Sequence, residues 1–240
     1  MSQSVLLVQD LVYAYTKNQS VLREITFDLI AGDRVALMGA TGSGKSTLLE
    51  NIIGIKEPQA GKIVINNIHV KPQNLAQIRR FIGFGFQDVN DQLFMPTILE
   101  DITFGPRNYG VPKAVAIDKA RELLAEFGLE AFAHRSAHEL SGGQRRLAAL
   151  ATILALEPDI LILDEPTTGL DPGWRRKLAQ VLLNWQGKVI LIASHDLHWL
   201  GKVTQRALVL SEGKIVIDGE MQSLLKDAET LESVGLPFDW

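Results

Sequence analysis

The sequence of 240 residues predicts an α/β fold with a parallel sheet at its core, an antiparallel β layer and an inserted α-helical subdomain. Two short apolar runs, at 160–163 and 189–193, are typical of parallel strands that are buried on both faces. In the segment 113–127, apolar residues recur about every 3.6 residues, which indicates a helix. With 46% hydrophobic residues, the chain can bury a substantial core.

The first quarter of the chain predicts the antiparallel β layer. Residues 5–15, 20–29 and 62–65 alternate in polarity or carry β-branched side chains, and turn signals at 31–33 and 66–67 lie between them. Alternation bounded by turns is the pattern of strands that bury one face and expose the other.

A glycine-rich loop follows a short apolar strand at 34–38 and precedes a predicted helix at 45–53. In such a loop, successive backbone N–H groups surround the β-phosphate of a nucleotide, and the helix N-terminus directs its dipole at the phosphates. Lys45 then reaches the β and γ oxygens, and the hydroxyl of Ser46 binds Mg²⁺. A turn needed only for packing would leave the buried ammonium of Lys45 without a partner. The predicted ATP-binding residues of the loop are Gly39, Ala40, Thr41, Gly42, Ser43, Gly44, Lys45, Ser46 and Thr47.

Strand, loop and helix in this order predict a P-loop NTPase core of the RecA-like type, with ATP and Mg²⁺ as cofactors.

Two adjacent carboxylates, Asp164 and Glu165, follow the apolar run at 160–163. A strand end of this kind borders the ligand crevice of α/β sheets, so Asp164 can hold Mg²⁺ through its water shell. Glu165 is placed to orient the water that attacks the γ-phosphate. The alternative for each carboxylate is a helix cap or a salt bridge.

The remaining segments read as alternating helices and strands around a helical insert. The expected elements are a helical insert over 96–140, helices at 145–156 and 175–185, strands at 188–193 and 207–211, and a hairpin turn at 212–213.

Two adjacent glycines at Gly142 and Gly143 expose N–H groups at the start of a helix, where a γ-phosphate would be attracted. The alternative is that Ser141 is only an N-cap.

Composition excludes several classes of function. A formal charge of −4 provides no basic field over the whole chain, so nucleic acid is not expected as a partner. The chain has no cysteine and therefore no disulfide framework, thiolate metal site or thiol redox chemistry. No apolar run approaches the roughly 20 residues that a membrane span requires, so a role at a membrane would depend on a partner.

Three further strings complete a recognisable set. Leu140-Ser-Gly-Gly-Gln144, Gly169-Leu-Asp171 and the isolated His195 after an apolar run resemble the signature, D-loop and switch histidine of ATP-binding cassette (ABC) ATPases, and this resemblance covers essentially the whole chain. It implies that two such domains pair head to tail, so that Ser141, Gly142, Gly143 and Gln144 of one copy cover the ATP held by the other.

The same resemblance assigns roles to three residues that say little alone. Gln87 is similar to the Q-loop glutamine, which contacts Mg²⁺ or the attacking water. His195 would sense the γ-phosphate through a neutral imidazole. Tyr15 matches the aromatic residue that stacks on adenine, although Tyr13 has the same strand parity and competes with it. The alternative is that Gln87 is a surface glutamine, that His195 is a structural histidine, and that both tyrosines are ordinary sheet residues.

The resemblance also implies a domain organisation. The chain is expected to form a single ABC ATPase domain over 1–240. Residues 1–86 and 160–240 would form the nucleotide-binding core with its β layer, and about 87–159 would form the helical subdomain.

The segment 86–106 is similar to the ATPases of energy-coupling-factor importers, including those for cobalt and nickel. This implies docking at the cytoplasmic face of the cell membrane under an integral-membrane coupling subunit, with a substrate-binding membrane subunit and a homodimer or a heterodimer with a related ATPase. Phe94, Met95 and Ile98 would form the apolar floor for a coupling helix, and Asp91, Glu100 and Asp101 would face its basic residues. The alternative is that Phe94 and Ile98 are ordinary core residues of the helical subdomain.

The leading hypothesis is therefore the ATP-hydrolysing subunit of an importer for a vitamin or a transition-metal ion, driven by closure and reopening of a dimer. The alternatives are a soluble ABC ATPase that acts on nucleic acid or ribosomes, and half of an exporter. Such soluble relatives usually carry coiled-coil arms, zinc modules or tandem cassettes.

Overall fold

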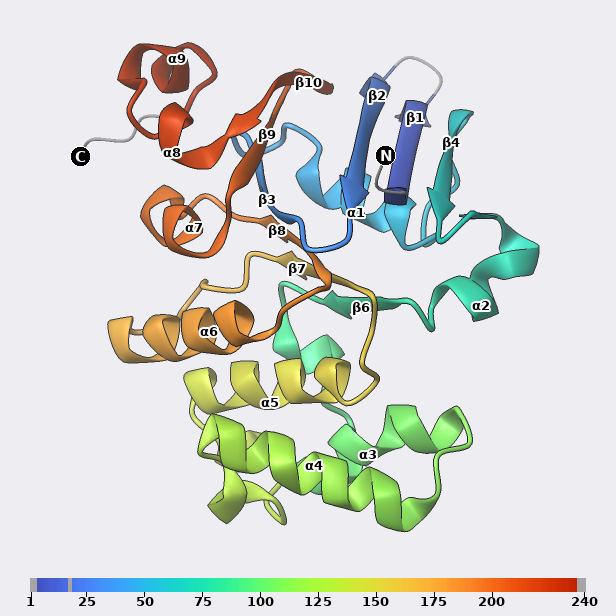
Figure 1. The fold of residues 1–240 in the computed structure, drawn as a ribbon, viewed down its shortest axis with the longest axis vertical. Helices are drawn as coiled ribbons and strands as arrows, with labels where there is room; N and C mark the ends of the chain where they lie inside the picture. The colour runs from blue at the N-terminus through green and yellow to red at the C-terminus, as the bar shows by residue number, and fades with distance from the viewer. Residues whose placement is uncertain (1–3, 17–18, 237–240) are drawn as a thin grey trace.

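The computed structural model describes residues 4–16 and 19–236, which form two sheets with helices on both sides of the central one (Figure 1). The strands are β1 (Ser4–Thr16), β2 (Gln19–Ile30), β3 (Arg34–Met38), β4 (Ala60–Ile65), β5 (Ile68–His69), β6 (Ile82–Gly85), β7 (Ile160–Asp164), β8 (Val189–Ala193), β9 (Arg206–Ser211) and β10 (Lys214–Glu220). The helices are α1 (Lys45–Ile52), α2 (Leu75–Ile78), α3 (Ile98–Asn108), α4 (Lys113–Phe127), α5 (Gly142–Leu154), α6 (Pro172–Asn184), α7 (Leu197–Val203), α8 (Met221–Leu224) and α9 (Ala228–Ser233).

The central sheet has the strand order β10-β9-β3-β8-β7-β6. β3 pairs in parallel with β8 and β9, and β7 pairs in parallel with β6 and β8. The edge strand β10 is antiparallel to β9. Because parallel strands end at the same edge of a sheet, the loops after β3, β6, β7 and β8 emerge side by side.

Alternation along the central strands divides the core into two clusters. In β3, Val35 and Leu37 point into one cluster, and Ala36 and Met38 point into the other. All five residues of β3, β7 and β8 are buried, which confirms the prediction from their apolar runs.

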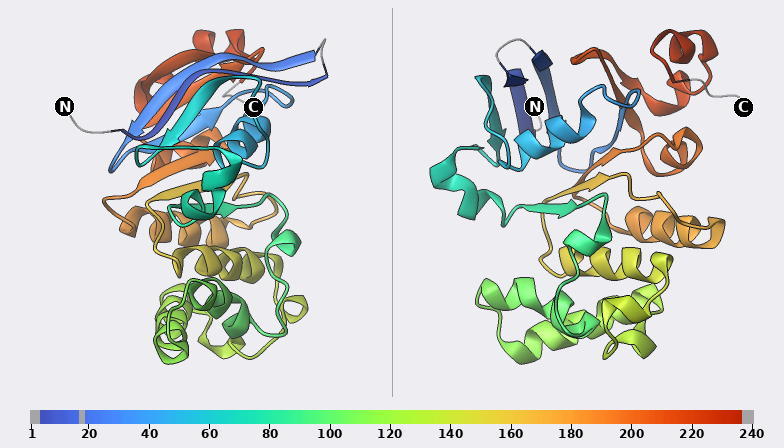
Figure 2. Two further views of the ribbon diagram at one scale, coloured as in Figure 1. Left: turned by 90° about the vertical axis from the view of Figure 1, so that its right-hand side faces the viewer. Right: turned by 180° about the vertical axis from the view of Figure 1, so that it is seen from behind.

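The second sheet, in the order β2-β1-β4-β5, is antiparallel and confirms the predicted β layer. Its buried face shares one cluster with β3 and with Leu48, Leu49 and Ile52 of α1. The helix after the glycine-rich loop is therefore held between the two sheets (Figures 1 and 2).

The helices α3 and α4 lie at the end of the molecule remote from the antiparallel sheet, and α5 lies between them and the central sheet (Figure 1). α4 has the predicted bounds, but its buried face differs from the predicted one. Val115, one of the apolar positions of the 3.6-residue pattern, is 56% exposed, whereas Ala116 is buried. Ala120, another position of that pattern, is buried as predicted. A pattern weighted by side-chain size does not find the small Ala116.

α5 starts at Gly142 after its N-cap Ser141, so the adjacent glycines lie at the start of a helix, as predicted. α6 starts at Pro172, three residues before the predicted helix, because Asp171 acts as its N-cap. β6 was not predicted as a strand, since it contains Gly83 and Gly85. Ile153 of α5 occupies the space that a side chain at Gly83 would fill, and Leu163 of β7 occupies the space at Gly85.

We expect Gly83→Ala to destabilise the chain. A Cβ at Gly83 would overlap Ile153 and lie 2.8 Å from a carbon of Pro158. Forcing an extra methyl group into a packed interface costs about 1–3 kcal/mol. Gly219→Ala is the matched control, because it also lies in a strand and a Cβ there would meet no atom within 4 Å. Urea titration should show a lower midpoint for Gly83→Ala alone, and equal midpoints in both variants would contradict this packing.

Candidate active site

The candidate site lies where β3, β7 and β8 end. Asp164, the last residue of β7, is paired with Ala193, the last residue of β8. The loop 39–44 leaves the neighbouring strand β3. The register of three adjacent strands thus places the glycine-rich loop, the two predicted carboxylates and the switch-histidine loop at one edge.

Backbone geometry explains the glycines of the loop 39–44. A Cβ at Gly39 would overlap the carbonyl oxygen of Leu210, so only glycine fits beside β9. Gly42 and Gly44 have φ values of 82° and 108°, which side chains disfavour. Gly44 is also the N-cap of α1 and offers no side chain to the helix. The first N–H groups of α1 are therefore not satisfied by a capping side chain, as an anion site requires.

Lys45 lies folded over its own loop. Its Nζ donates to the carbonyl oxygens of Gly39 at 2.7 Å and of Ala40 at 3.2 Å. Burial lowers the pKa of Lys45, while the charges of Glu165 and Asp164 act in the opposite direction. A desolvated ammonium beside two carboxylates is a strong partner for the oxygens of a triphosphate.

Asp164 is buried at the end of β7. Burial raises the pKa of Asp164, and a hydrogen bond from Ser46 lowers it in part. Its Oδ1 is buried with no hydrogen-bond partner. An unpartnered carboxylate oxygen next to a serine hydroxyl is the oxygen donor set that Mg²⁺ favours, so these residues fit the predicted ion.

Glu165 turns back towards β8. Its φ is +47°, an uncommon conformation for a non-glycine residue that costs about 1 kcal/mol or more. Its Oε2 accepts a hydrogen bond from Ser194 Oγ at 3.1 Å and lies 2.8 Å from Nδ1 of His195. The Glu165 side chain is 12% exposed and that of His195 is 72% exposed, so the carboxylate is sheltered and the imidazole faces solvent.

A cavity of about 510 Å³ joins these groups. It is lined by Tyr15, Gln19, Val21, Thr41, Gly42, Gly44, Lys45, Ser46, Thr47, Gln87, Asp164, Glu165, Thr168 and His195. Residues that the sequence placed in five separate strings thus meet at one cavity. Gln19 and Val21 were not anticipated, because β2 approaches the loop from the other sheet and no motif marks that approach.

The structure distinguishes the two candidate tyrosines. Tyr15 is 55% exposed and lines the cavity, whereas Tyr13 packs against a core cluster. The two rings meet edge to face with their centroids 5.2 Å apart, and the hydroxyl of Tyr15 is 3.0 Å from Oγ1 of Thr47. Stacking on adenine remains a prediction for Tyr15, and its position beside the cavity favours it over Tyr13.

The signature lies elsewhere. Among the described residues that line the cavity, none comes from the stretch between Ser141 and Gln144. Ser141 caps α5 through a capping box: its Oγ accepts from the N–H of Gln144, and Oε1 of Gln144 accepts from the N–H of Ser141 at 2.8 Å. Asp171 likewise caps α6, with Oδ1 3.0 Å from the N–H of Trp174. The alternative considered for the signature, a helix cap, is therefore present, and a contact with ATP of another copy remains a prediction.

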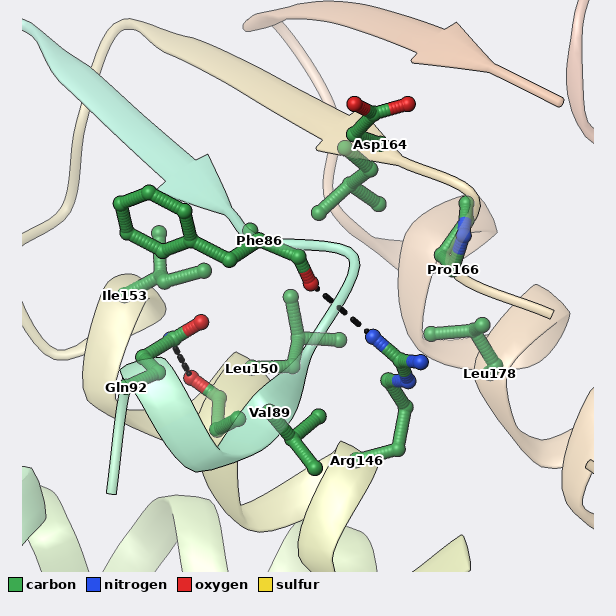
Figure 3. Close-up of a pocket in the computed structure, with 12 residues that line it drawn as sticks. Phe86, Val89, Gln92, Arg146, Leu150, Ile153, Asp164, Pro166 and Leu178 are labelled. Atoms are coloured by element: carbon green, nitrogen blue, oxygen red, sulfur yellow. Dashed lines mark hydrogen bonds between the residues drawn. The ribbon is translucent and has the colours of Figure 1, made fainter. Parts of the chain in front are cut away.

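Arg146 is a residue that the sequence motifs did not single out. It lies in α5 and donates to the carbonyl oxygen of Phe86 at 3.0 Å, as Figure 3 shows. It also donates to the carbonyl oxygen of Gln87 at 2.9 Å. Burial lowers the pKa of Arg146. The guanidinium thus ties the helix that starts at the signature to the backbone that carries Gln87. The sequence signal for Arg146 is its basic side chain shortly after the signature.

The predicted groove for a coupling helix is correct only in part. Phe94 is 63% exposed and packs edge to face on Phe104. Ile98 is fully buried in the core, which agrees with the alternative for this residue. Asp101 is 4% exposed, and its Oδ1 accepts from the N–H groups of Phe94 and Met95 at 3.0 and 2.9 Å. Its carboxylate therefore holds the turn before α3 and is not available to a partner's cations.

In the part of the chain that the structure describes, no helix is both long and apolar enough to cross a membrane.

We expect Asp164→Asn to stabilise the ligand-free chain at neutral pH. The pKa of Asp164 is raised in the folded state, so the folded state disfavours the charged form. The resulting cost is fully present above the folded pKa and disappears below the unfolded value, about 3.9. The urea midpoint of the variant should exceed that of the wild type at pH 7.5, and the difference should vanish towards about pH 4. Asp118→Asn, at an exposed position of α4, serves as the control. A gain that does not depend on pH would contradict this account.

We expect Gly143→Ala to disturb the start of α5. A Cβ there would overlap the indole of Trp174, which lies in the first turn of α6. The clash should lower the free energy of unfolding by about 1–3 kcal/mol. At Gly142 a Cβ would meet no atom within 4 Å, so Gly142→Ala should be neutral or slightly stabilising. Trp174→Leu should restore part of the stability of Gly143→Ala in thermal unfolding; equal losses with and without it would count against the contact.

Comparison with known proteins agrees with this geometry. The ABC transporter family model matches residues 22–168, more than half of the chain. The energy-coupling factor transporter ATP-binding protein EcfA of Methanothermobacter thermautotrophicus is 37% identical over 95% of this chain and 75% of its own length.

Two solved structures share the fold and more than a quarter of the sequence. CbiO1 from Clostridium perfringens, part of the ABC transporter complex CbiONQ, has a TM-score of 0.86 and 31% identity over 98% of this chain and 96% of its own. A dimeric ATP-binding cassette in a post-hydrolysis state, bound to ADP and Pi, has a TM-score of 0.80 and 28% identity over 90% of this chain and 98% of its own. The chain therefore belongs to the ABC transporter family and is one of its ATPases.

Proposed function

We propose that this chain is the ATP-hydrolysing subunit of an importer of the energy-coupling-factor type, which carries a vitamin or a transition-metal ion. The observation that carries the hydrolytic part is the cavity at which Lys45, Asp164, Glu165 and His195 meet. The similarity to EcfA and to CbiO1 supports the importer class.

In this proposal the glycine-rich loop and the N-terminus of α1 bind the phosphates, and Lys45 exchanges its loop carbonyls for phosphate oxygens. Glu165 orients the attacking water and accepts its proton, and His195 contacts the γ-phosphate from the exposed side. Ser46, Asp164 and Gln87 would hold Mg²⁺, which neutralises charge on the phosphates when it is bound.

The second half of the site would come from another copy or from a related ATPase. The signature of the same chain does not line the cavity among the described residues, which leaves its open side free for the signature of a partner. The dimeric, ADP-bound cassette supports a paired arrangement. ATP binding would close such a dimer and hydrolysis would reopen it. Residues 87–159 would move together as a subdomain. Within it, Arg146 of α5 is hydrogen-bonded to the backbone of Gln87.

The membrane partners would bind near α3. The exposed pair Phe94 and Phe104 offers apolar area, and the exposed Asp91 and Glu100 offer negative charge to a basic helix of a coupling subunit. That subunit, together with a substrate-binding membrane subunit, would hold the ATPase at the cytoplasmic face of the membrane. A net charge of −4 supports a protein partner over nucleic acid.

We expect Glu165→Gln to lower ATP turnover about a hundredfold or more, because the amide cannot accept the proton of the attacking water. The variant should accumulate as an ATP-bound dimer, which light scattering after gel filtration with Mg²⁺-ATP would detect. Glu122→Gln, at an exposed position of α4, should behave as the wild type. Full turnover by Glu165→Gln, or full turnover by a protein that stays monomeric at every concentration, would refute the proposal.

A further inference from the structure

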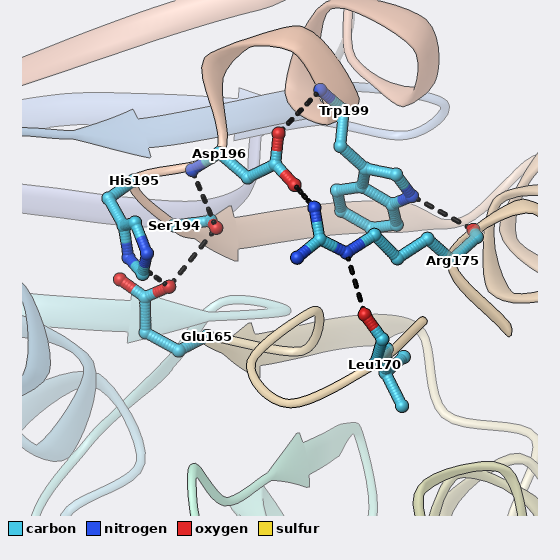
Figure 4. Close-up of polar contacts among 7 residues, drawn as sticks. All are labelled: Glu165, Leu170, Arg175, Ser194, His195, Asp196 and Trp199. Carbon is cyan, nitrogen blue, oxygen red and sulfur yellow. Dashed lines mark hydrogen bonds and ion pairs between the residues drawn. The ribbon is translucent and has the colours of Figure 1, made fainter. Parts of the chain in front are cut away.

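Arg175 of α6 connects two loops that leave adjacent strands (Figure 4). Its Nε donates to the carbonyl oxygen of Leu170 at 3.1 Å, in the loop after β7. Its Nη1 forms an ion pair with Oδ2 of Asp196 at 2.8 Å, in the loop after β8. One guanidinium therefore holds the D-loop segment 169–171 against the residue that follows the switch histidine.

From Asp196 the contacts continue to the candidate general base. The N–H of Asp196 donates to Oγ of Ser194 at 3.2 Å. That hydroxyl donates to Oε2 of Glu165 at 3.1 Å, the same oxygen that lies 2.8 Å from Nδ1 of His195. A continuous series of hydrogen bonds and covalent links thus runs from the carbonyl of Leu170 to the carboxylate of Glu165, as Figure 4 shows.

Further hydrogen bonds hold Asp196 and Arg175 in place. Oδ1 of Asp196 caps α7 by accepting from the N–H of Trp199 at 3.0 Å, and the indole Nε1 of Trp199 donates to the carbonyl oxygen of Arg175 at 3.0 Å. The N–H of Arg175 donates to the carbonyl oxygen of Asp171 at 3.0 Å. Trp199 is 5% exposed, so it cannot shift without repacking the core.

The ion pair between Arg175 and Asp196 contributes little to the stability of the fold. The side chain of Arg175 is 43% exposed and that of Asp196 is 16% exposed. Solvent screening leaves such a pair a small contribution to folding. The arrangement nevertheless requires a specific geometry, because Nε and Nη1 contact acceptors on two different loops. The planar guanidinium presents its donors in a fixed fork that fits both acceptors, and a lysine ammonium on a flexible stem lacks that fixed geometry.

We propose that Arg175 is a positioning residue for ATP hydrolysis, which sets the D-loop segment 169–171 and the Ser194–Glu165 hydrogen bond in one fixed relation. The inference rests on the proposed function of Glu165. Loss of the guanidinium lets the loop after β8 move, and the carboxylate of Glu165 then loses its alignment with the attacking water. Nucleotide binding is unaffected, because neither the loop 39–44 nor Lys45 contacts Arg175 through any hydrogen bond among the described residues.

The test compares steady-state ATP hydrolysis by the full chain in Arg175→Ala, Arg175→Lys and Asp196→Asn. Arg175→Ala should lower kcat about ten- to hundredfold, as expected for misplacement of a catalytic group, and leave KM for ATP within about twofold. Arg175→Lys keeps the charge beside Asp196 but loses the fixed fork that fits both acceptors, so its kcat should be intermediate. Asp196→Asn keeps an acceptor for the N–H of Trp199 and should also lower kcat.

A double-mutant cycle separates the series of contacts from independent effects. The double variant Arg175→Ala with Asp196→Asn should be no slower than Arg175→Ala alone, because both changes break the same link. Arg176→Ala removes an equal charge at the exposed neighbouring position and should keep the kcat of the wild type. Thermal unfolding midpoints within a few degrees of the wild type would show that the variants are folded.

Wild-type kcat in Arg175→Ala, a loss confined to KM, or additive effects in the cycle would each overturn the inference. Glu165→Gln in the same assay keeps the two proposals apart. If Glu165→Gln is inactive while Arg175→Ala is normal, only the positioning role fails. If Glu165→Gln turns over ATP at the rate of the wild type, the proposed role of Glu165 fails, and the positioning role fails with it.

Discussion

The common edge at which β3, β7 and β8 end is the constraint on which the rest of the structure depends. Backbone pairing of three neighbouring parallel strands fixes the starting points of the loops at 39–44, 165–171 and 194–196. Side chains from distant parts of the chain can then meet without any long, ordered loop to bring them together. Cover on both faces, by α1 and the antiparallel sheet on one side and by α5, α6 and α7 on the other, keeps this edge rigid.

Rigidity at that edge is accompanied by an electrostatic cost. The same burial shifts the pKa of Lys45 down and the pKa of Asp164 up, and Oδ1 of Asp164 has no hydrogen-bond partner. Glu165 adds a strained backbone conformation. Each of these features weakens the chain by itself, and each is suited to a ligand that brings phosphates and a cation. Strain and unsatisfied charge thus concentrate where chemistry is proposed, and the apolar clusters on either side supply the stability.

The parts of the fold and of the site that depend on local pattern could be predicted from the sequence. The apolar strands at β7 and β8, the helix after the glycine-rich loop and the antiparallel layer follow from periodicity and turn residues. Properties set by tertiary packing could not. β6 was missed because its glycines leave room for Ile153 of α5 and Leu163 of β7, and Val115 was placed on the buried face although the small Ala116 is the residue buried there. The sequence left open whether Ile98 lies on a docking surface or in the core, and it is buried. Asp101 was expected to face a partner, yet its carboxylate accepts hydrogen bonds from backbone N–H groups. No local pattern reveals Ser194 or Arg146 as partners, since their acceptors are far away in sequence.

The contact of Arg146 with the segment after β6 uses main-chain acceptors, the carbonyl oxygens of Phe86 and Gln87. Every amino acid carries that carbonyl, so replacement of either side chain leaves the acceptors in place. The link to α5 therefore does not depend on the side chains at 86 and 87, and the side chain of Gln87 stays free for the contact with Mg²⁺ that we propose. Position 146 tolerates less change, because the fixed fork of the guanidinium fits the two carbonyl oxygens and the flexible ammonium of a lysine lacks that geometry.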